Sequence, residues 1–303
     1  MLYNPRSSRF RDVRVEVLDK VMNPDFLRDA GLTGVMVMKY EVEPTDVDDN
    51  AGKLAKILRD GDMVLAVGGD ATGVIGVNAI MQVTADARLA VLPYGNYNDL
   101  ARTLGTRTVE EVLVGKMGEL WPLEILVDGE HFRYATCYMT MGMTAEAVEI
   151  FDDKKIRKEL QKGHKSPWRS YFPLMKWYFR NRKKKRFIPR FKLNGVEMDR
   201  RISDYAVVNG RTMATVMKGG EWFLDTKKFR RETGKLANLW NLGVLMVRSV
   251  FFRVPGVEVE RDLIEFLEAG EVELQAEGEY RRFRGVGTVE IRKAEKSLKV
   301  IMR

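Results

Sequence analysis

Short apolar runs alternate with helical patterns in the first third of the chain. Residues 63–67 are uniformly apolar, and residues 88–92 form a second run that begins with Arg88. A short apolar run that ends at glycine or proline is typical of a strand buried on both faces of a parallel sheet. Helices are predicted at residues 73–83 and 99–104, directly after these strands. This alternation predicts a doubly wound α/β domain.

Further elements are predicted before these strands. Residues 2–3 are predicted to end a first strand, and the apolar residues 34–38 predict another buried strand. Residues 46–60 carry apolar side chains at helical spacing, which predicts an amphipathic helix. A helix followed by a strand and a glycine turn fits the same βαβ rhythm.

The pattern changes near residue 120. Beyond it, short segments often alternate apolar with polar residues, which is typical of antiparallel strands with one solvated face. These segments are residues 123–127, 132–141, 187–193, 205–209, 257–260, 271–276 and 287–292.

Two domains are therefore predicted. Residues 1–120 form the α/β domain, and residues 121–303 form an antiparallel β-rich, sandwich-like domain. Pairing of the last strand with the first domain is the alternative. Residues 236–252 are strongly apolar, and we expect them to pack in the core; a helix or extended segment on the lipid-binding side is the alternative.

Composition narrows the class of protein. The 303 residues are 45% hydrophobic and 31% charged, which fits a soluble globular chain. Cys137 is the single cysteine, so no internal disulfide can form, and a reducing, cytoplasmic compartment is expected. No stretch approaches the roughly 20 apolar residues of a membrane-spanning helix, and the first residues show no secretory signal pattern. The net charge of +8 suits an anionic partner.

Glycines and acidic residues follow the two central strands. Gly68 and Gly69 allow a tight turn and the close approach of another backbone or of a phosphate. Asp70 and Asp99 come after neighbouring strands, at the sheet edge where open α/β sheets bind ligands. The amides at the start of the helix after Asp70 would face an anion, and Asn98 or Asp99 can cap the helix at residues 99–104.

These segments resemble a known family. Residues 68–72 (GGDAT) resemble the GGDGT loop of diacylglycerol and sphingosine-type lipid kinases, a loop that the related NAD kinases share. Residues 92–105 (LPYGNYNDLARTLG) resemble the longer and more specific LPxGTxNDFARTLG segment. Residues 4–9 resemble the NPxSG loop, and residues 276–279 resemble the DGE motif. The resemblance covers nearly the whole chain.

The resemblance implies a lipid kinase that uses ATP and Mg²⁺ to phosphorylate a lipid hydroxyl in a cleft between the two domains. It implies Glu277 as the general base, with Glu279, Asp70 and Asp99 organising the metal. Asp225 matches one residue of a stretch that holds a structural Mg²⁺. The residues expected to bind the nucleotide are Asn4, Ser7, Ser8, Gly68, Gly69, Asp70, Ala71, Thr72, Gly95, Asn96 and Asn98.

Four departures from the family pattern keep other interpretations open. Ala71 replaces a glycine and would be strained at positive φ. Residues 74–75 replace an Asn-Glu pair, residues 96–97 replace a threonine-containing pair, and Glu277 replaces aspartate. The alternatives are a soluble small-molecule kinase of the NAD-kinase type, and a catalytically weak or silent homologue that binds nucleotide or lipid.

One segment predicts a membrane partner. Six of the seven residues from 180 to 186 are basic, and they follow a cluster of aromatic residues, so residues 168–190 are predicted to bind an anionic membrane surface. A helix with an aromatic core face and a solvated basic end is the alternative. Nucleic acid is not expected as a partner, because no nucleic-acid-binding module is present. A homodimer remains open.

Overall fold

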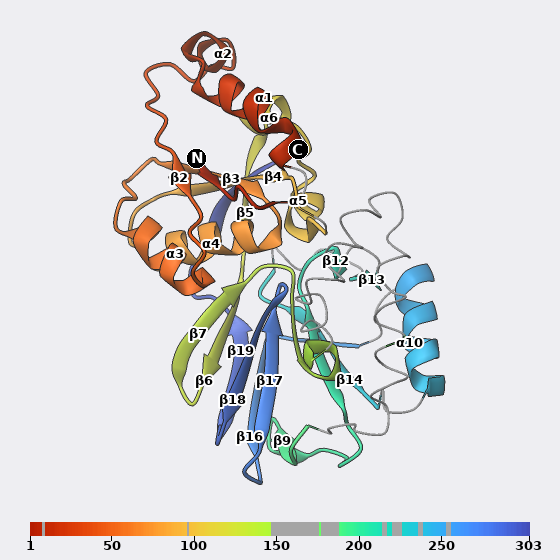
Figure 1. Cartoon of the computed structure of the whole chain (residues 1–303). Helices are drawn as coiled ribbons and strands as arrows, with labels where there is room; N and C mark the ends of the chain where they lie inside the picture. The colour runs from red at the N-terminus through yellow and green to blue at the C-terminus, as the bar shows by residue number, and fades with distance from the viewer. Residues whose placement is uncertain are drawn as a thin grey trace. The chain divides into compact units, whose positions relative to one another are not determined.

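The chain forms two compact units. The computed structural model describes residues 1–7, 10–95, 97–146, 176, 188–213, 217–219, 226–235, 239–252 and 256–303 (Figure 1). One unit consists of Met1–Trp121 together with Glu295–Arg303, and the other of Pro122–Ala294. The final nine residues therefore fold with the N-terminal part of the chain.

The first unit is built on a six-stranded sheet. Its strands, in spatial order, are β2 (Tyr40–Glu41), β1 (Leu2–Tyr3), β3 (Met63–Gly68), β4 (Arg88–Pro93), β20 (Leu298–Met302) and β5 (Lys116–Leu120). The first five strands run parallel and β5 pairs antiparallel with β20. Strand β3 is central and almost wholly buried, as its uniformly apolar sequence predicts.

Helices cover both faces of this sheet. They are α1 (Phe10–Met22), α2 (Pro24–Asp29), α3 (Val47–Ala55), α4 (Asp70–Met81), α5 (Asp99–Leu104) and α6 (Val109–Leu113). Residues of α1 and α6 join Leu65, Val67, Ala90 and Leu92 in one core. Gly76 of α4 approaches Leu89 and Val64 on the other side. The predicted doubly wound α/β fold is confirmed.

The strand predicted at residues 34–38 is wrong. Val35, Met36 and Met38 are exposed, and the strand at this position is Tyr40–Glu41. Strand β1 has two residues, and their parallel partners are Tyr40 and Glu41. The apolar run therefore lies just before the strand, and its Met38 carbonyl accepts a hydrogen bond from the Met1 amino group at 2.6 Å.

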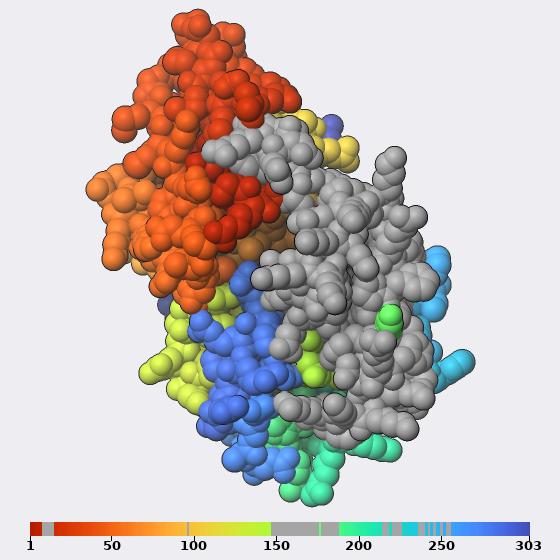
Figure 2. Space-filling model, in the orientation of Figure 1, coloured from red at the N-terminus to blue at the C-terminus, as the bar shows by residue number. Residues whose placement is uncertain are grey.

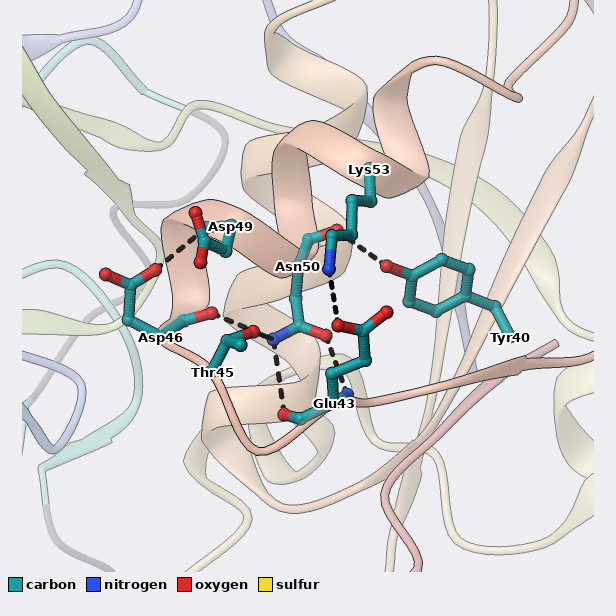
Figure 3. Close-up of polar contacts among 7 residues, drawn as sticks. All are labelled: Tyr40, Glu43, Thr45, Asp46, Asp49, Asn50 and Lys53. Carbon is teal, nitrogen blue, oxygen red and sulfur yellow. Dashed lines mark hydrogen bonds and ion pairs between the residues drawn. The ribbon is translucent and has the colours of Figure 1, made fainter.

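A buried asparagine fixes the entry to α3 (Figure 3). Asn50 is fully buried and its amide nitrogen donates to Thr45 Oγ1 at 2.9 Å and to the Asp46 carbonyl at 2.8 Å. Its amide oxygen accepts from the Glu43 backbone N–H at 2.9 Å. Lys53 and Glu43 form an ion pair beside it. The buried amide is thus satisfied from several sides, as a buried polar group requires.

The second unit is a sandwich of two antiparallel six-stranded sheets. In spatial order, the first contains β10 (Val196–Glu197), β9 (Phe191–Leu193), β16 (Arg261–Phe266), β19 (Thr288–Lys293), β6 (Leu123–Val127) and β7 (Glu130–Ala135). The second contains β15 (Val257–Val259), β14 (Phe229–Gly234), β11 (Asp204–Val208), β8 (Tyr138–Gly142), β17 (Glu271–Ala276) and β18 (Glu279–Arg284). A two-stranded ribbon of β12 (Thr212–Met213) and β13 (Met217–Lys218) completes the described strands.

One core joins the two sheets of this unit. It contains Ile125 and Ile264 from the first sheet, and Met139, Val207 and Leu274 from the second. These residues alternate with outward-facing positions along their strands, which is the pattern of a sandwich. The predicted antiparallel β-rich unit is confirmed.

The expectation that residues 236–252 pack in the core is wrong for the described side chains. The segment forms the helix α10 (Leu239–Phe251), on which Trp240, Val247 and Phe251 are exposed. The light-blue atoms of α10 reach the outline of the molecule in Figure 2. Among the described helices, none has the length and apolar character needed to cross a membrane.

Candidate active site

Three loops converge at one edge of the parallel sheet. Strand β1 pairs with β3, and β3 pairs with β4, so the loops after these strands leave from the same edge. A Cβ atom at Gly68 would lie 2.3 Å from Thr72 Oγ1 and 3.1 Å from Ser7 Oγ. Only glycine therefore leaves room for the two hydroxyl groups, which come from the loop after β1 and from the start of α4.

The second and third loops are in direct backbone contact. A Cβ atom at Gly95 would lie 2.2 Å from the Gly69 Cα, a separation that no side chain can adopt. The Tyr94 N–H also donates to the Gly68 carbonyl at 2.8 Å. The glycines of the two motifs thus form one continuous main-chain surface. The sequence predicts each loop separately, and the structure shows that the two loops are in contact.

Helix α4 begins at this surface. Its N-cap is Gly69, which has no side chain to bind the first amides of the helix. Thr72, in the first turn, is 1% exposed, and within the described part of the chain its hydroxyl has no hydrogen-bond partner. A helix N-terminus with a buried, unpartnered hydroxyl and glycine walls fits a phosphate group.

The two predicted aspartates occupy the starts of neighbouring helices. Asp70 is the first residue of α4, and its Oδ1 accepts a hydrogen bond from the Leu100 N–H of α5 at 3.2 Å. Asp99 begins α5 and is buried. The structure therefore brings Asp70 next to the backbone of Asp99. Among the described residues there is no cluster of three or more acidic, histidine or cysteine side chains that could hold a metal alone.

Two asparagines predicted to bind nucleotide are used by their own loops. Asn4 Oδ1 accepts from the Arg6 N–H at 2.9 Å. Asn98 bonds to both the N–H and the carbonyl of Gly95, each at 2.8 Å, and its φ is 57°. The side chain of Asn98 therefore closes its loop and does not cap α5 as expected.

Two departures from the family pattern prove harmless to the fold. Ala71 lies inside α4 and is absent from the positive-φ residues of the described chain, so the expected strain does not arise. Val74 and Ile75 are buried in the core side of the same helix. Their apolar side chains pack in the unit instead of facing the loops.

Glu277 is a buried carboxylate in the second unit. It is 3% exposed, and its Oε1 accepts a hydrogen bond from Thr136 Oγ1 at 2.6 Å and further bonds from the backbone N–H groups of Thr136 and Cys137. Three donors on one oxygen fix the orientation of the carboxylate. Glu277 is therefore not the solvated residue of a surface turn.

The turn that carries Glu277 also changes its relation to Glu279. Glu277 and Gly278 have φ values of 52° and 90°, and they connect β17 to β18 in a tight hairpin. Glu279 begins β18 opposite Ala276 and is half-buried. Because Glu277 lies in the turn and not in a strand, strand alternation does not place the two carboxylates on one face.

A polar network supports the Thr136–Cys137 turn. Asn209 donates from its amide nitrogen to the Thr136 carbonyl at 2.7 Å, and the N–H groups of Asn209 and Gly210 donate to the Cys137 carbonyl. The buried ammonium of Lys293 donates to Asn209 Oδ1. Thr136 and Lys293 were missed from the sequence because neither lies in a motif. Asn209-Gly210, at the end of β11, was the one available signal.

A second pair of acidic side chains lies on the outer face of the same sheet. Burial raises the pKa of Asp204 to about 7, and the Thr144 N–H that donates to it opposes that rise. Burial also raises the pKa of Glu232 to about 7; the charge of Asp204 adds to the shift and Arg248 opposes it. The two carboxylates therefore titrate near neutral pH.

Several expected site residues lie outside the described residues. They are Ser8, Asn96, Asp225 and, within the segment predicted to bind a membrane, all of residues 168–190 except Lys176 and residues 188–190.

The fold observed is an α/β unit with glycine loops at one sheet edge, followed along the chain by a β-sandwich unit. Residues 2–124 match the family model of the diacylglycerol kinase catalytic domain. The resemblance read from the sequence is therefore confirmed over these residues.

Solved structures share the fold of the whole chain. One protein from Bacillus anthracis str. Sterne, described as a candidate diacylglycerol kinase, has a TM-score of 0.69 at 16% identity and covers 100% of this chain and 96% of its own. A further structure, described as a diacylglycerol kinase of the same organism, has a TM-score of 0.64 at 14% identity, covering 100% and 95%. The comparison with curated proteins gave no match.

Proposed function

We propose that this protein is a lipid kinase that transfers a phosphoryl group from ATP to the hydroxyl of a diacylglycerol-like lipid. The family match over residues 2–124 supports a kinase. The proposal adds to this kinase a lipid acceptor, ATP as the nucleotide and Mg²⁺ as the metal.

The start of α4 carries the proposal. Phosphoryl transfer depends on positioning and on neutralising charge, so a kinase needs backbone N–H groups and hydroxyls directed at the phosphates. The uncapped α4 N-terminus, the buried Thr72 hydroxyl and the Gly69–Gly95 backbone contact supply such a cradle. A side chain at Gly68 would displace the hydroxyls of Thr72 and Ser7, and one at Gly95 would displace the Gly69 backbone.

The acidic residues fit a metal that is shared with the nucleotide. Mg²⁺ is commonly bound through one or two carboxylates together with substrate phosphates, so a cage of three protein carboxylates is not required. When bound, ATP supplies the phosphoryl group and Mg²⁺ neutralises its charge. Asp70, half-buried beside the cradle, would hold the metal, and its bond to Leu100 would keep the carboxylate in place. Asp99 and Glu279 would complete the set.

Glu277 would accept the proton of the acceptor hydroxyl. A general base must be held in a fixed orientation within reach of the proton. The bonds from Thr136 and Cys137 supply that orientation in the second unit.

The test measures transfer from labelled ATP with Mg²⁺ to vesicles that contain diacylglycerol, and in parallel to NAD. We expect lipid phosphorylation that is lost in Asp70→Asn and retained in Asp29→Asn, a matched change at an exposed aspartate at the end of α2. Transfer to NAD alone would establish the soluble small-molecule kinase instead. Binding of ATP without transfer to any acceptor would establish the silent homologue.

A further inference from the structure

Helix α10 exposes an apolar stripe along one side. Trp240, Val244, Val247 and Phe251 are 76%, 38%, 55% and 67% exposed. Their spacing of four, three and four residues places them on one face of an α-helix. Phe252, directly after the helix, is 72% exposed. Large apolar side chains gathered in one stripe indicate an interaction surface, whereas single exposed ones do not.

The charge on the helix segment itself has one sign, whereas acidic residues lie on neighbouring elements: Glu232 of β14 interacts with Arg248. Residues 235–253 contain three basic residues and no aspartate or glutamate. Arg248 is exposed on the helix beside the stripe, and the Lys218 ammonium donates to the Phe251 carbonyl at the end of the helix at 3.4 Å. Lys235 lies just before the helix and forms an ion pair with Asp199.

These features distinguish between two binding partners for the stripe, a second copy of this chain and an anionic lipid surface. A second copy of this helix would bring Arg248 against another basic, acid-free segment, without an opposite charge on either copy of the helix to pair with it. An anionic lipid surface offers phosphates to the basic side chains and an apolar layer to the stripe. Tryptophan is also favoured at the boundary between headgroups and acyl chains.

We propose that α10 docks on the surface of an anionic lipid bilayer. The helix, about 20 Å long, lies in the plane of the interface with Trp240, Val244, Val247 and Phe251 in the headgroup–acyl boundary. Arg248 and Lys218 face the lipid phosphates. The proposal uses none of residues 168–190 and does not depend on the proposed kinase activity.

Vesicle co-sedimentation of the full chain without nucleotide tests the proposal. Vesicles of phosphatidylcholine with phosphatidylglycerol are compared with vesicles of phosphatidylcholine alone. We expect binding to the anionic vesicles, weakened by high salt, and a loss of about tenfold in Val247→Glu or Phe251→Glu. Val196→Glu, a matched change at a 66% exposed valine of the same unit, should bind like the wild type.

Two results would overturn this proposal. Equal binding by Val247→Glu, Phe251→Glu and wild type would exclude the stripe from the contact. A dimer in the absence of vesicles that Val247→Glu dissociates, without any change in vesicle binding, would assign the stripe to a second copy. Because no nucleotide is present, neither result depends on whether the chain is a kinase. Circular dichroism and thermal unfolding of each variant check that its overall fold and stability match the wild type.

Discussion

The two units build their candidate sites from different materials. In the first unit the site is main chain: Gly69 and Gly95 touch, and the start of α4 presents amides. In the second unit the site is a side chain: Glu277 is buried and held by donors from Thr136 and Cys137. The main-chain site requires residues without a side chain, whereas the Glu277 site requires hydrogen-bond donors that lie far from Glu277 in the sequence.

This difference predicts different responses to mutation. A site made of backbone is damaged by adding atoms, and its loss should appear as a loss of both fold and binding. A site made of one carboxylate is damaged by changing its chemistry, and the fold should survive. Four changes test this comparison, from the largest expected effect to the smallest.

Glu277→Gln should have the largest effect on activity. The amide oxygen can still accept from Thr136, so the fold is kept, but a general base is lost, which typically costs about 10²–10⁴-fold in turnover. Kinase assays with lipid vesicles measure this. Glu271→Gln, at the far end of the same hairpin, removes a surface ion pair with Arg284 and should stay within about twofold. Equal losses in both variants would remove Glu277 from the chemistry.

Gly95→Ala should damage the first unit. The added Cβ would lie 2.2 Å from the Gly69 Cα, so one backbone must move, at a cost of about 1–3 kcal/mol or more. Thermal unfolding and ATP binding measure the change. Gly52→Ala in α3 is the control, because its Cβ meets no atom within 4 Å and its φ is not positive. A variant at Gly95 that melts and binds like the wild type would contradict the packed-loop surface.

Asp204→Asn should change how stability depends on pH. Burial raises the pKa of Asp204 to about 7 from its usual 3.8, so the folded state keeps a proton that the unfolded state loses between these values. The contribution of Asp204 to wild-type stability should therefore fall as pH rises from about 4 to about 7. Asparagine cannot lose that proton, so the stability of the variant relative to wild type should increase over this window, by about 3 kcal/mol.

Denaturant unfolding at several pH values measures how the free energy of unfolding of each protein changes with pH. Asp199→Asn is the control: Arg201 and Lys235 hold the pKa of Asp199 below its usual value, so this carboxylate is ionised in both states above pH 5 or so. Its difference from wild type should stay constant between pH 5 and pH 7. Parallel curves for Asp204→Asn and wild type would contradict the neutral-pH titration.

Thr136→Val should have the smallest effect. It removes the hydroxyl that donates to Glu277 at 2.6 Å but keeps the two backbone donors, so the carboxylate stays in place with looser orientation. One hydrogen bond to a charged group is worth about 1.5–3 kcal/mol, and partial compensation should leave a loss of turnover of about tenfold. Thr140→Val, which removes a buried bond to Gln275, should leave turnover unchanged. A loss equal to that of Glu277→Gln would show that the amides do not hold the carboxylate.

The sequence predicts the first site better than the second. Glycines at residues 68–69 and 95 stand beside apolar runs, so short-range patterns reveal both the strands and the loops that follow them. Glu277 was found through a resemblance. Its donor Thr136, and the residues Asn209 and Lys293 that support the Thr136 turn, were given no role, because they are brought together by strand pairing over long separations. The apolar residues 34–38 misled the prediction, since a two-residue β1 determines which residues can pair there.

Strand β20 has a consequence for how this chain acquires its structure. It inserts between β4 and β5, so the sheet of the first unit stays incomplete until Leu298–Met302 has emerged from the ribosome. Almost the entire second unit is synthesised before that. A fragment limited to residues 2–124, the span of the family match, would expose the hydrogen-bonding edge of β4 to other chains. Recombinant work on the first unit should therefore fuse or co-express the C-terminal nine residues.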